Sequence, residues 1–213
     1  MEMKIENITY QEGEILIGQF DEDVEALKSM LTNFEVYEAE FEKLSTTKRK
    51  QEFLAARLLL NKVLGREVVV CYDENNKPYL QNASEQISIS HSKNYVAVMV
   101  HPIHAVGIDL ELRTEKVKRV YKRFLNPAEQ QYLYNEKDNS YLEIAWSAKE
   151  VLYKLIGKKV FDFSTELEIF PFQLNDSGVL HVLHVSGSRI YRLHYFQNAT
   201  YTMVVGVDKK IKL

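Results

Sequence analysis

The stretch 106-VGIDLELR-113 holds the first residues that could do chemistry, because it places two carboxylates side by side on a predicted strand. Apolar and polar residues alternate through it, so Asp109 and Glu111 point to the same face, with Gly107 before them. Side chains at positions i and i+2 of a strand stand about 6.6 Å apart, which lets both acids reach one hard cation. Magnesium suits such oxygen ligands and often shares its coordination with substrate phosphates. A solvated strand face that carries two acids is the simpler alternative.

A second candidate lies on the predicted helix 144-IAWSAKEVLYKLIGK-158. At about 100° per residue, Glu150 and Lys154 fall together on one side, with Trp146 beside them. The opposite side is apolar and would be buried; it carries Ile144, Ala148, Val151, Leu152 and Leu155. Taken alone, Glu150 and Lys154 would be an ordinary surface ion pair worth roughly 0.3–0.5 kcal/mol.

Five earlier residues could bind an anion: Arg49, Arg57, Lys77, Ser90 and His91. The two arginines lie within about 80° of each other on a predicted helix, and guanidinium groups match phosphate geometry well. Ser90 and His91 end a predicted strand whose isoleucines face the core, and Lys77 stands in a turn. The ordinary alternatives are surface salt bridges for the arginines, a structural hydrogen bond for His91 and a solvated Lys77.

The elements that must position these residues alternate between helix and sheet twice along the chain. Helical spacing predicts helices at residues 21–33, 34–44, 47–64, 115–123, 127–135 and 140–156. Alternating or β-branched segments predict strands at 68–73, 87–90, 95–100 and 105–112, and four more between Phe161 and Lys212, at 166–172, 179–185, 189–196 and 201–208. We expect the strands at 87–90, 95–100 and 105–112 to form one antiparallel sheet.

Several helix ends carry recognisable signals. Asn126 to Glu129 reads as a capping box with proline at the first helical position, and Ser140 to Glu143 reads as a second capping box. Gly65 and Gly157 stand where a left-handed residue would end the helices before them.

The order of elements predicts an α+β protein made of two similar α+β halves. Residues 91–100 and 197–207 both run from a polar turn into an apolar strand, which favours an internal duplication. We therefore expect an N-terminal half at 1–105 and a C-terminal half at 106–213, related by pseudo-two-fold symmetry.

Composition limits the classes of function. A chain of 213 residues with 46% hydrophobic content can bury a substantial core. Its 27 basic and 30 acidic residues give a net charge of −3, so we expect no general binding to nucleic acid or membrane surfaces, and any anion site must be local. The single Cys71 excludes an internal disulfide and suits a reducing compartment. The N-terminal residues lack the pattern of a signal peptide, and no run approaches a membrane span, so we expect a cytoplasmic protein.

The order and spacing of these pieces resemble the 4′-phosphopantetheinyl transferase superfamily, of the larger, single-chain, surfactin-synthetase-activating type. The family pattern is a GID-x-E strand, here 107–111, followed about 40 residues later by an aromatic-Ser-x-Lys-Glu helix ending in Lys, here 146–154. The segment NPAEQQYL at 126–133 stands for the helix between them, and the resemblance runs from about 48 to 159. One departure is Val151, where the family usually has Ala or Ser, and a larger residue there could crowd the site.

The resemblance implies an enzyme that transfers the 4′-phosphopantetheine moiety of coenzyme A to a serine of an apo acyl or peptidyl carrier protein and releases adenosine 3′,5′-bisphosphate, as a holo-acyl-carrier-protein synthase does. It implies that Mg²⁺ is held by Asp109, Glu111 and Glu150. It assigns catalysis to Glu150 as the proton acceptor, to Lys154, and to Lys149 as an assistant. It assigns coenzyme A binding to the N-terminal half, through Arg49, Arg57, Lys77, Ser90 and His91. We expect a monomer, because two similar halves could pack as a dimer would.

The segment 115-EKVKRVYKRF-124 carries five basic residues on a short predicted helix. Carrier proteins are typically acidic around their serine, so this segment could dock a carrier helix. A plain solvated face is the alternative.

Three rival functions remain open at this point. A non-catalytic coenzyme A or nucleotide-binding module would bind the cofactor without transfer. A zinc hydrolase could use His101, His104 and Asp109, although that spacing lacks a helix and a fourth ligand. A structural or adaptor protein would need no metal.

Overall fold

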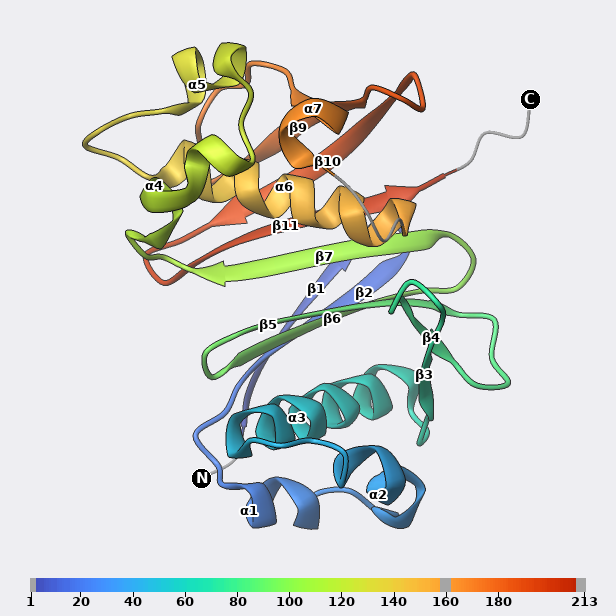
Figure 1. Ribbon diagram of the computed structural model, residues 1–213. Coiled ribbons are helices and arrows are strands. Elements are labelled where there is room, and N and C mark those ends of the chain that lie inside the picture. The colour runs from blue at the N-terminus through green and yellow to red at the C-terminus, as the bar shows by residue number, and fades with distance from the viewer. Residues whose placement is uncertain (1–2, 158–161, 210–213) are drawn as a thin grey trace. The chain divides into compact units, whose positions relative to one another are not determined.

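The computed structural model describes residues 3–157 and 162–209 of the chain, which divides into two compact units (Figure 1). Unit 1 spans Met1–Ala105 and unit 2 spans Val106–Leu213. Each unit combines helices with a sheet of its own, which confirms the α+β class. Phe161 and residues 210–212, which belong to the last predicted strand region, lie outside the described residues. Within the described residues, no helix has both the length and the apolar character that a bilayer span requires.

Unit 1 is built on an antiparallel sheet of four strands in the order β1-β2-β6-β5. Their bounds are Lys4–Tyr10 for β1, Gly13–Gln19 for β2, Gln86–Ser92 for β5 and Tyr95–His101 for β6. Val98 of β6 lies opposite Leu16 on one side and Ile89 on the other. The hairpin of β1 and β2 is not among the predicted strands. Most of β1 is exposed, and the apolar run from Ile15 to Ile17 is buried on both faces, so neither strand alternates clearly.

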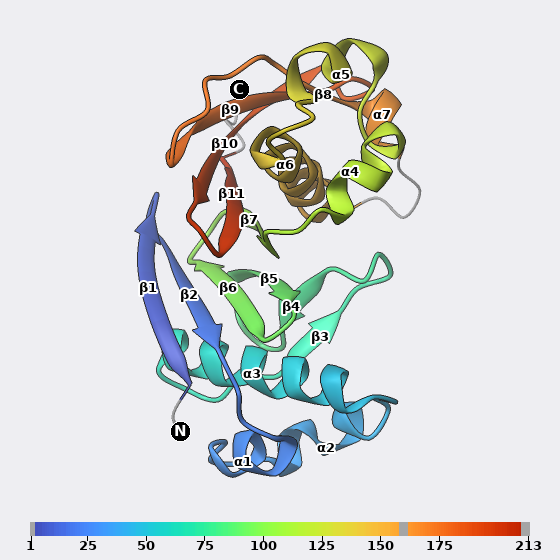
Figure 2. The same cartoon turned by 90° about the vertical axis from the view of Figure 1, so that its left-hand side faces the viewer.

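The helices of unit 1 lie on one face of this sheet, and α3 is in direct contact with it. The bounds are Val24–Ser29 for α1, Glu35–Phe41 for α2 and Thr47–Leu64 for α3, and a small hairpin follows with β3 at Val70–Tyr72 and β4 at Pro78–Leu80. The predicted bounds of α3 are confirmed, including Gly65 as a left-handed cap with φ of 63°. Leu54, Leu59 and Leu60 of α3 are fully buried in the core of the unit. Figure 2 shows α1 and α2 on the side of α3 that faces away from the sheet.

Unit 2 has a five-stranded sheet in the order β7-β11-β10-β9-β8. The bounds are Ala105–Leu112 for β7, Leu167–Ile169 for β8, Ser177–His184 for β9, Arg189–Gln197 for β10 and Tyr201–Asp208 for β11. The expectation that β5, β6 and β7 share one sheet is therefore wrong. Both edges of β6 are already paired, with β2 and β5, so no edge remains for β7 in that sheet.

The helices of unit 2 surround a central helix, α6, which Figure 2 shows almost along its axis. The bounds are Lys116–Val120 for α4, Tyr121–Arg123 for the short 3₁₀ turn η1, Pro127–Leu133 for α5, Ser140–Ile156 for α6 and Phe163–Glu166 for α7. The capping box of α5 is confirmed: Glu129 N–H donates to Asn126 Oδ1 at 2.9 Å, and Asn126 N–H donates to Glu129 Oε2 at 2.8 Å. Gly157 ends α6 in the left-handed region, as predicted.

The second predicted capping box is wrong. The residue that precedes α6 is Asn139, whose side chain makes no capping hydrogen bond. The side chains of Ser140 and Glu143 instead bond to residues outside the helix, Arg113 and Thr114 among them.

Two glycines let α6 lie directly against β7 and β11. A Cβ atom on Gly107 would stand 2.7 Å from the carbonyl oxygen of Val151 and 3.0 Å from its Cγ1. A Cβ on Gly206 of β11 would stand 3.2 Å from the same Cγ1. Val151 is the position that departs from the family pattern. It fits because the facing residues on β7 and β11 are glycines without side chains, and not because its own helix makes room for it.

The two units repeat one strand order. In unit 1 the order β2-β6-β5 places β6, the last of the three in sequence, between β2, the first, and β5, with which β6 forms a hairpin. In unit 2 the order β7-β11-β10 places β11 in the same way between β7 and β10. In both units the long helix, α3 or α6, follows the first of these strands in sequence. This repetition fits the duplication, while the pseudo-two-fold relation between the halves stays a prediction.

Candidate active site

The polar faces of β7 and α6 meet in unit 2, and an ion pair closes one end of this contact. Lys154 Nζ donates to Asp109 Oδ1 at 2.9 Å and to the carbonyl oxygen of Ile108 at 2.7 Å. Asp109 is buried, with 5% of its surface exposed. Two of the predicted site residues are thus brought together from positions 45 residues apart.

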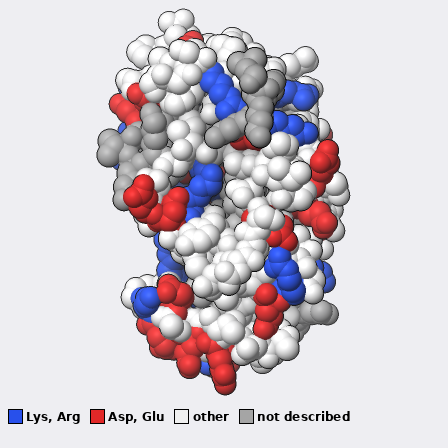
Figure 3. Space-filling view, turned by 90° about the vertical axis from the view of Figure 1, so that its right-hand side faces the viewer, with Lys and Arg blue, Asp and Glu red and all other residues white. Residues whose placement is uncertain are grey.

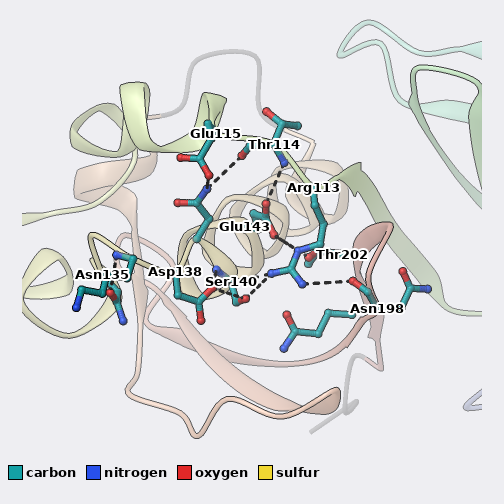
Figure 4. Close-up of polar contacts among 12 residues, drawn as sticks. Arg113, Thr114, Glu115, Asn135, Asp138, Ser140, Glu143, Asn198 and Thr202 are labelled. Atoms are coloured by element: carbon teal, nitrogen blue, oxygen red, sulfur yellow. Dashed lines mark hydrogen bonds and ion pairs between the residues drawn. The ribbon is translucent and has the colours of Figure 1, made fainter.

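A second ion pair closes the other end of the same contact. Arg113 Nε donates to Glu143 Oε2 at 3.1 Å, and Glu143 is also buried. Arg113, directly after β7, is the next alternate position after Asp109 and Glu111. Seven residues separate Glu143 from Glu150 and four separate Glu150 from Lys154, so at about 100° per residue the three share one face of α6. Figure 4 shows the Arg113 guanidinium directed at Glu143.

Glu150 lies between these pairs on α6 and interacts with two acids of β7 as well as with Lys154. Burial, followed by repulsion from Asp109 and Glu111, raises the pKa of Glu150 to about 7, while attraction to Lys154 works in the opposite direction. The interface therefore has opposite charges at both ends and like charges in the middle. A divalent cation would relieve this repulsion, and the oxygen-only donor set of Asp109, Glu111 and Glu150 suits Mg²⁺.

The three carboxylates are close enough to repel one another without already enclosing a cation. Within residues 3–157 and 162–209, no three His, Cys, Asp or Glu side chains are gathered in an arrangement that could hold a metal ion. The ammonium group of Lys154 supplies positive charge to Asp109 in this arrangement. The donor chemistry fits a magnesium ion, and its binding would require the acid side chains to converge and Lys154 to turn from Asp109.

Lys149, the neighbour of Glu150, lies in a different environment. Its side chain is completely buried, and Nζ donates to Glu129 Oε2 at 2.7 Å. It also lies within hydrogen-bonding distance of the carbonyl oxygens of Phe124 at 2.7 Å, Leu167 at 2.8 Å and Phe163 at 3.1 Å. Burial lowers the pKa of Lys149, and Glu129 opposes that shift. This environment favours a structural role for Lys149 over the predicted catalytic one.

In unit 1 the structure brings Arg49 and His91 together. Arg49 Nη1 lies 3.0 Å from His91 Nε2, and because a guanidinium can only donate, Nε2 accepts and the ring proton is on Nδ1. Glu52 is buried beside this pair: its Oε2 lies 3.4 Å from Arg49 Nη1, and its Oε1 lies 3.5 Å from His91 Nδ1. Its Oε1 also lies 3.6 Å from Lys48 Nζ. Sequence reasoning missed Glu52, although its spacing of three and four residues from the two cations was a usable signal.

The other predicted coenzyme A residues lie in more ordinary surroundings. Arg57 is buried, and its guanidinium stacks on Phe53 with 3.7 Å between its Cζ atom and the ring centroid. Burial lowers the pKa of Arg57, and no carboxylate of the described residues lies within 4.0 Å of it. Ser90 is also buried, and the backbone N–H of Lys77 donates to Asp73 Oδ1 at 2.9 Å in the predicted turn.

His101, one of the two histidines of the zinc alternative, has a structural role. His101 Nδ1 accepts hydrogen bonds from the backbone N–H groups of Ile103 at 3.0 Å and His104 at 2.9 Å, so the ring proton is on Nε2. That nitrogen lies 3.2 Å from the carbonyl oxygen of Gln11, which accepts from it. Both nitrogens of His101 therefore have partners, and the residue offers no lone pair to a zinc ion.

Comparison with known proteins supports the recognition made from the two motifs. Residues 105–205 match the family described as the 4′-phosphopantetheinyl transferase superfamily, and the matched stretch contains β7, α6 and the strands that follow. A search of curated proteins gives no match. The family suggested by the motifs is confirmed over this stretch: residues 105–205, in the C-terminal half of the chain, match the 4′-phosphopantetheinyl transferase superfamily.

Proposed function

We propose that this protein transfers the 4′-phosphopantetheine moiety of coenzyme A to a serine of an apo acyl or peptidyl carrier protein in a magnesium-dependent reaction. Members of its superfamily transfer phosphopantetheine to carrier proteins. The observation that carries the proposal is the position of Glu150, which faces Asp109 and Glu111 between two ion pairs. We also propose that the enzyme is of the larger single-chain type and acts as a monomer, because the strand order repeats within one chain.

The residues of unit 2 divide the chemistry between them. Mg²⁺ bound by Asp109, Glu111 and Glu150 would supply positive charge to the diphosphate of coenzyme A. Glu150 accepts the proton of the carrier serine as the general base. The serine oxygen forms a bond to the phosphorus that carries pantetheine, and the bond to the adenosine-side phosphate breaks. Lys154, one turn along, stabilises the negative charge on the departing bisphosphate.

The residues of unit 1 would bind the phosphates of coenzyme A. Arg49 and His91 are the best-supported pair, since both are held beside the carboxylate of Glu52 in a defined geometry. Guanidinium and imidazole donors suit a phosphate monoester such as the 3′-phosphate. Arg57, Lys77 and Ser90 are proposed for the same ligand.

The direct test is a transfer assay with purified protein, Mg²⁺, labelled coenzyme A and a panel of apo carrier proteins. The proposal expects label on the carrier and adenosine 3′,5′-bisphosphate in solution in equal amounts. Coenzyme A binding without transfer to any carrier would instead support the non-catalytic binding module.

Magnesium binding is expected to release protons in a pH-dependent way. The pKa of Glu150 is about 7 without metal, so near pH 6 the carboxyl is mostly protonated and must lose its proton to bind Mg²⁺. Calorimetric titrations in buffers of different ionisation enthalpy should show close to one proton released near pH 6 and little release near pH 8.5. Glu150→Gln should abolish the difference.

The same raised pKa makes the metal-free protein lose stability as pH rises. Between the ordinary pKa of a glutamate and about 7, the folded state binds more protons at Glu150 than the unfolded state does. The free energy of unfolding should therefore fall over this range, and Glu150→Gln should flatten the fall. A proton release that does not change between pH 6 and 8.5 would contradict the assignment.

A cavity of about 230 Å³ links the acidic site to the basic segment around α4. Its lining includes Glu111 of β7, Trp146 of α6, and Lys116, Val117 and Val120 of α4. The segment from Lys116 to Arg123 carries five basic residues. In contrast, Figure 3 shows Asp and Glu gathered on the surface of unit 1 where α1 and α2 lie. Charge complementarity therefore favours the α4 segment as the docking surface for an acidic carrier.

Charge reversal at exposed positions of this segment should weaken carrier binding. Arg119 and Lys122 are both exposed, whereas Lys118 bonds to the carbonyl oxygen of Glu136 at 2.7 Å and should be left intact. Arg119→Glu with Lys122→Glu is expected to raise KM for the carrier about ten-fold or more, with KM for coenzyme A unchanged. Lys43→Glu, at an exposed position of unit 1, is the control. An unaltered carrier KM in the double variant would refute docking on α4.

A further inference from the structure

The ion pair of Arg113 and Glu143 takes no part in the chemistry proposed above, although it lies on the same two polar faces. We propose that Arg113 and Glu143 are positioning residues that hold β7 and α6 at the separation at which Glu111 and Glu150 can bind one divalent cation. This inference rests on the proposed magnesium-dependent function and names two residues that the family motifs do not include.

The contacts of Glu143 all lead from α6 to the strands beside it. Oε2 accepts from Arg113 Nε at 3.1 Å and lies 3.4 Å from the hydroxyl of Thr202 on β11, and Oε1 accepts from the backbone N–H of Thr114 at 3.1 Å. Glu143 is 5% exposed and the side chain of Arg113 is 32% exposed, so the carboxylate is shielded from water while the guanidinium stays partly in contact with it. Glu143 thus ties α6 to the end of β7 and to β11.

Arg113 continues this tie into the first turn of α6 and into the next loop, as Figure 4 shows. Its Nη2 donates to Ser140 Oγ at 2.5 Å, and its Nη1 donates to the carbonyl oxygen of Asn198 at 3.3 Å. Ser140 in turn donates to Asp138 Oδ1 from its backbone N–H at 2.9 Å and from its hydroxyl at 2.7 Å, and these two bonds keep the pKa of Asp138 below its ordinary value. The guanidinium is therefore fixed from three directions.

The need for such a tie follows from the charges between the two ends. Glu111 and Glu150 repel each other, and that repulsion acts to separate the elements that carry them. Two opposite-charge pairs resist the separation, Arg113 with Glu143 and Lys154 with Asp109. In the proposed reaction Lys154 turns to the phosphate and leaves Asp109. Arg113 and Glu143, about 10 Å along the helix from Glu150, then remain as the ion pair that holds the interface.

The experiment compares the loss of this ion pair with the loss of a matched one elsewhere in unit 2. Arg189 pairs with Asp208, and the side-chain exposures of 37% and 7% are close to the 32% and 6% of Arg113 and Glu143. Mn²⁺ binding, followed by the electron paramagnetic resonance signal of the free ion, is measured for the wild type, Glu143→Gln and Asp208→Asn. Both variants should unfold at lower temperature than the wild type. We expect only Glu143→Gln to weaken Mn²⁺ binding, by roughly ten-fold or more, as changes outside the ligand set commonly do.

A second pair of variants, at Arg113, tests the same ion pair in case the Glu143 variant does not fold. Arg113→Lys keeps one charged contact and should retain most of the Mn²⁺ affinity, whereas Arg113→Met should lose it to the same extent as Glu143→Gln. Wild-type Mn²⁺ affinity in Glu143→Gln or in Arg113→Met would overturn the inference and leave the proposed function standing. A wild-type protein that binds no Mn²⁺ would overturn the proposed metal site and this inference with it.

Discussion

Replacing Glu150 by glutamine is expected to lower kcat for phosphopantetheine transfer by two to four orders of magnitude and, at the same time, to stabilise the metal-free protein. The rate falls because a positioned general base typically contributes about 10²–10⁴-fold, and an amide cannot accept the serine proton. Stability rises because the substitution removes a partly buried charge that Asp109 and Glu111 repel. Steady-state rates with saturating carrier and thermal unfolding in a chelator measure the two effects on one sample.

The pairing of opposite effects makes this a sharp test. A residue whose role is only structural would lose activity and stability together. Glu168→Gln, a partly buried acid on β8 of the same unit, is the matched control and should leave turnover close to that of the wild type. Near-wild-type turnover in Glu150→Gln would remove the proposed base from the reaction and with it the central assignment of this site.

The parts of this site that the sequence predicts are those set by local periodicity. A period of two along β7 puts Asp109 and Glu111 on one face, and a period of 3.6 along α6 puts Glu150 and Lys154 on another. These periods hold wherever the elements lie in the fold. The sequence could not show that the two faces meet, because that contact depends on Gly107 and Gly206, which leave room for Val151.

The two wrong predictions, the second capping box and the sheet that contains β7, have one cause. In each case the partner that decides the structure lies far along the chain. Ser140 and Glu143 have the spacing of a capping box, but their side chains bond instead to Arg113 and Thr114, which follow β7. The strand β7 follows β6 closely in sequence, yet the N-terminal β2 already occupies the edge of β6. In both cases a tertiary contact between distant residues decides the structure, and a short stretch of sequence does not contain both partners.

The buried contacts of Lys149 lead to the second large expected effect. Lys149→Met should lower the free energy of unfolding by about 3–5 kcal/mol, because it leaves Glu129 as a buried charge without its partner. Glu129 also accepts from the backbone N–H groups of Asn126 and Ile169, so its disturbance reaches both α5 and β8. Urea unfolding gives the loss of stability. Turnover is measured at low temperature, where the variant is still folded.

Comparing variants of Lys149 and the neighbouring Lys154 distinguishes the structural role expected for Lys149 from the catalytic role proposed for Lys154. Lys154→Met removes a partly exposed ammonium from buried Asp109, so it should lower stability less than Lys149→Met does and should lower kcat strongly. Lys149→Met should do the reverse, with kcat of the folded fraction close to that of the wild type. Adding Glu129→Gln to Lys149→Met should recover part of the lost stability, since the unpaired charge is then gone. If Lys149→Met instead kept its stability and lost its turnover, Lys149 would have the catalytic role that the family motif suggests. The carbonyl oxygens around its ammonium group would then need another explanation.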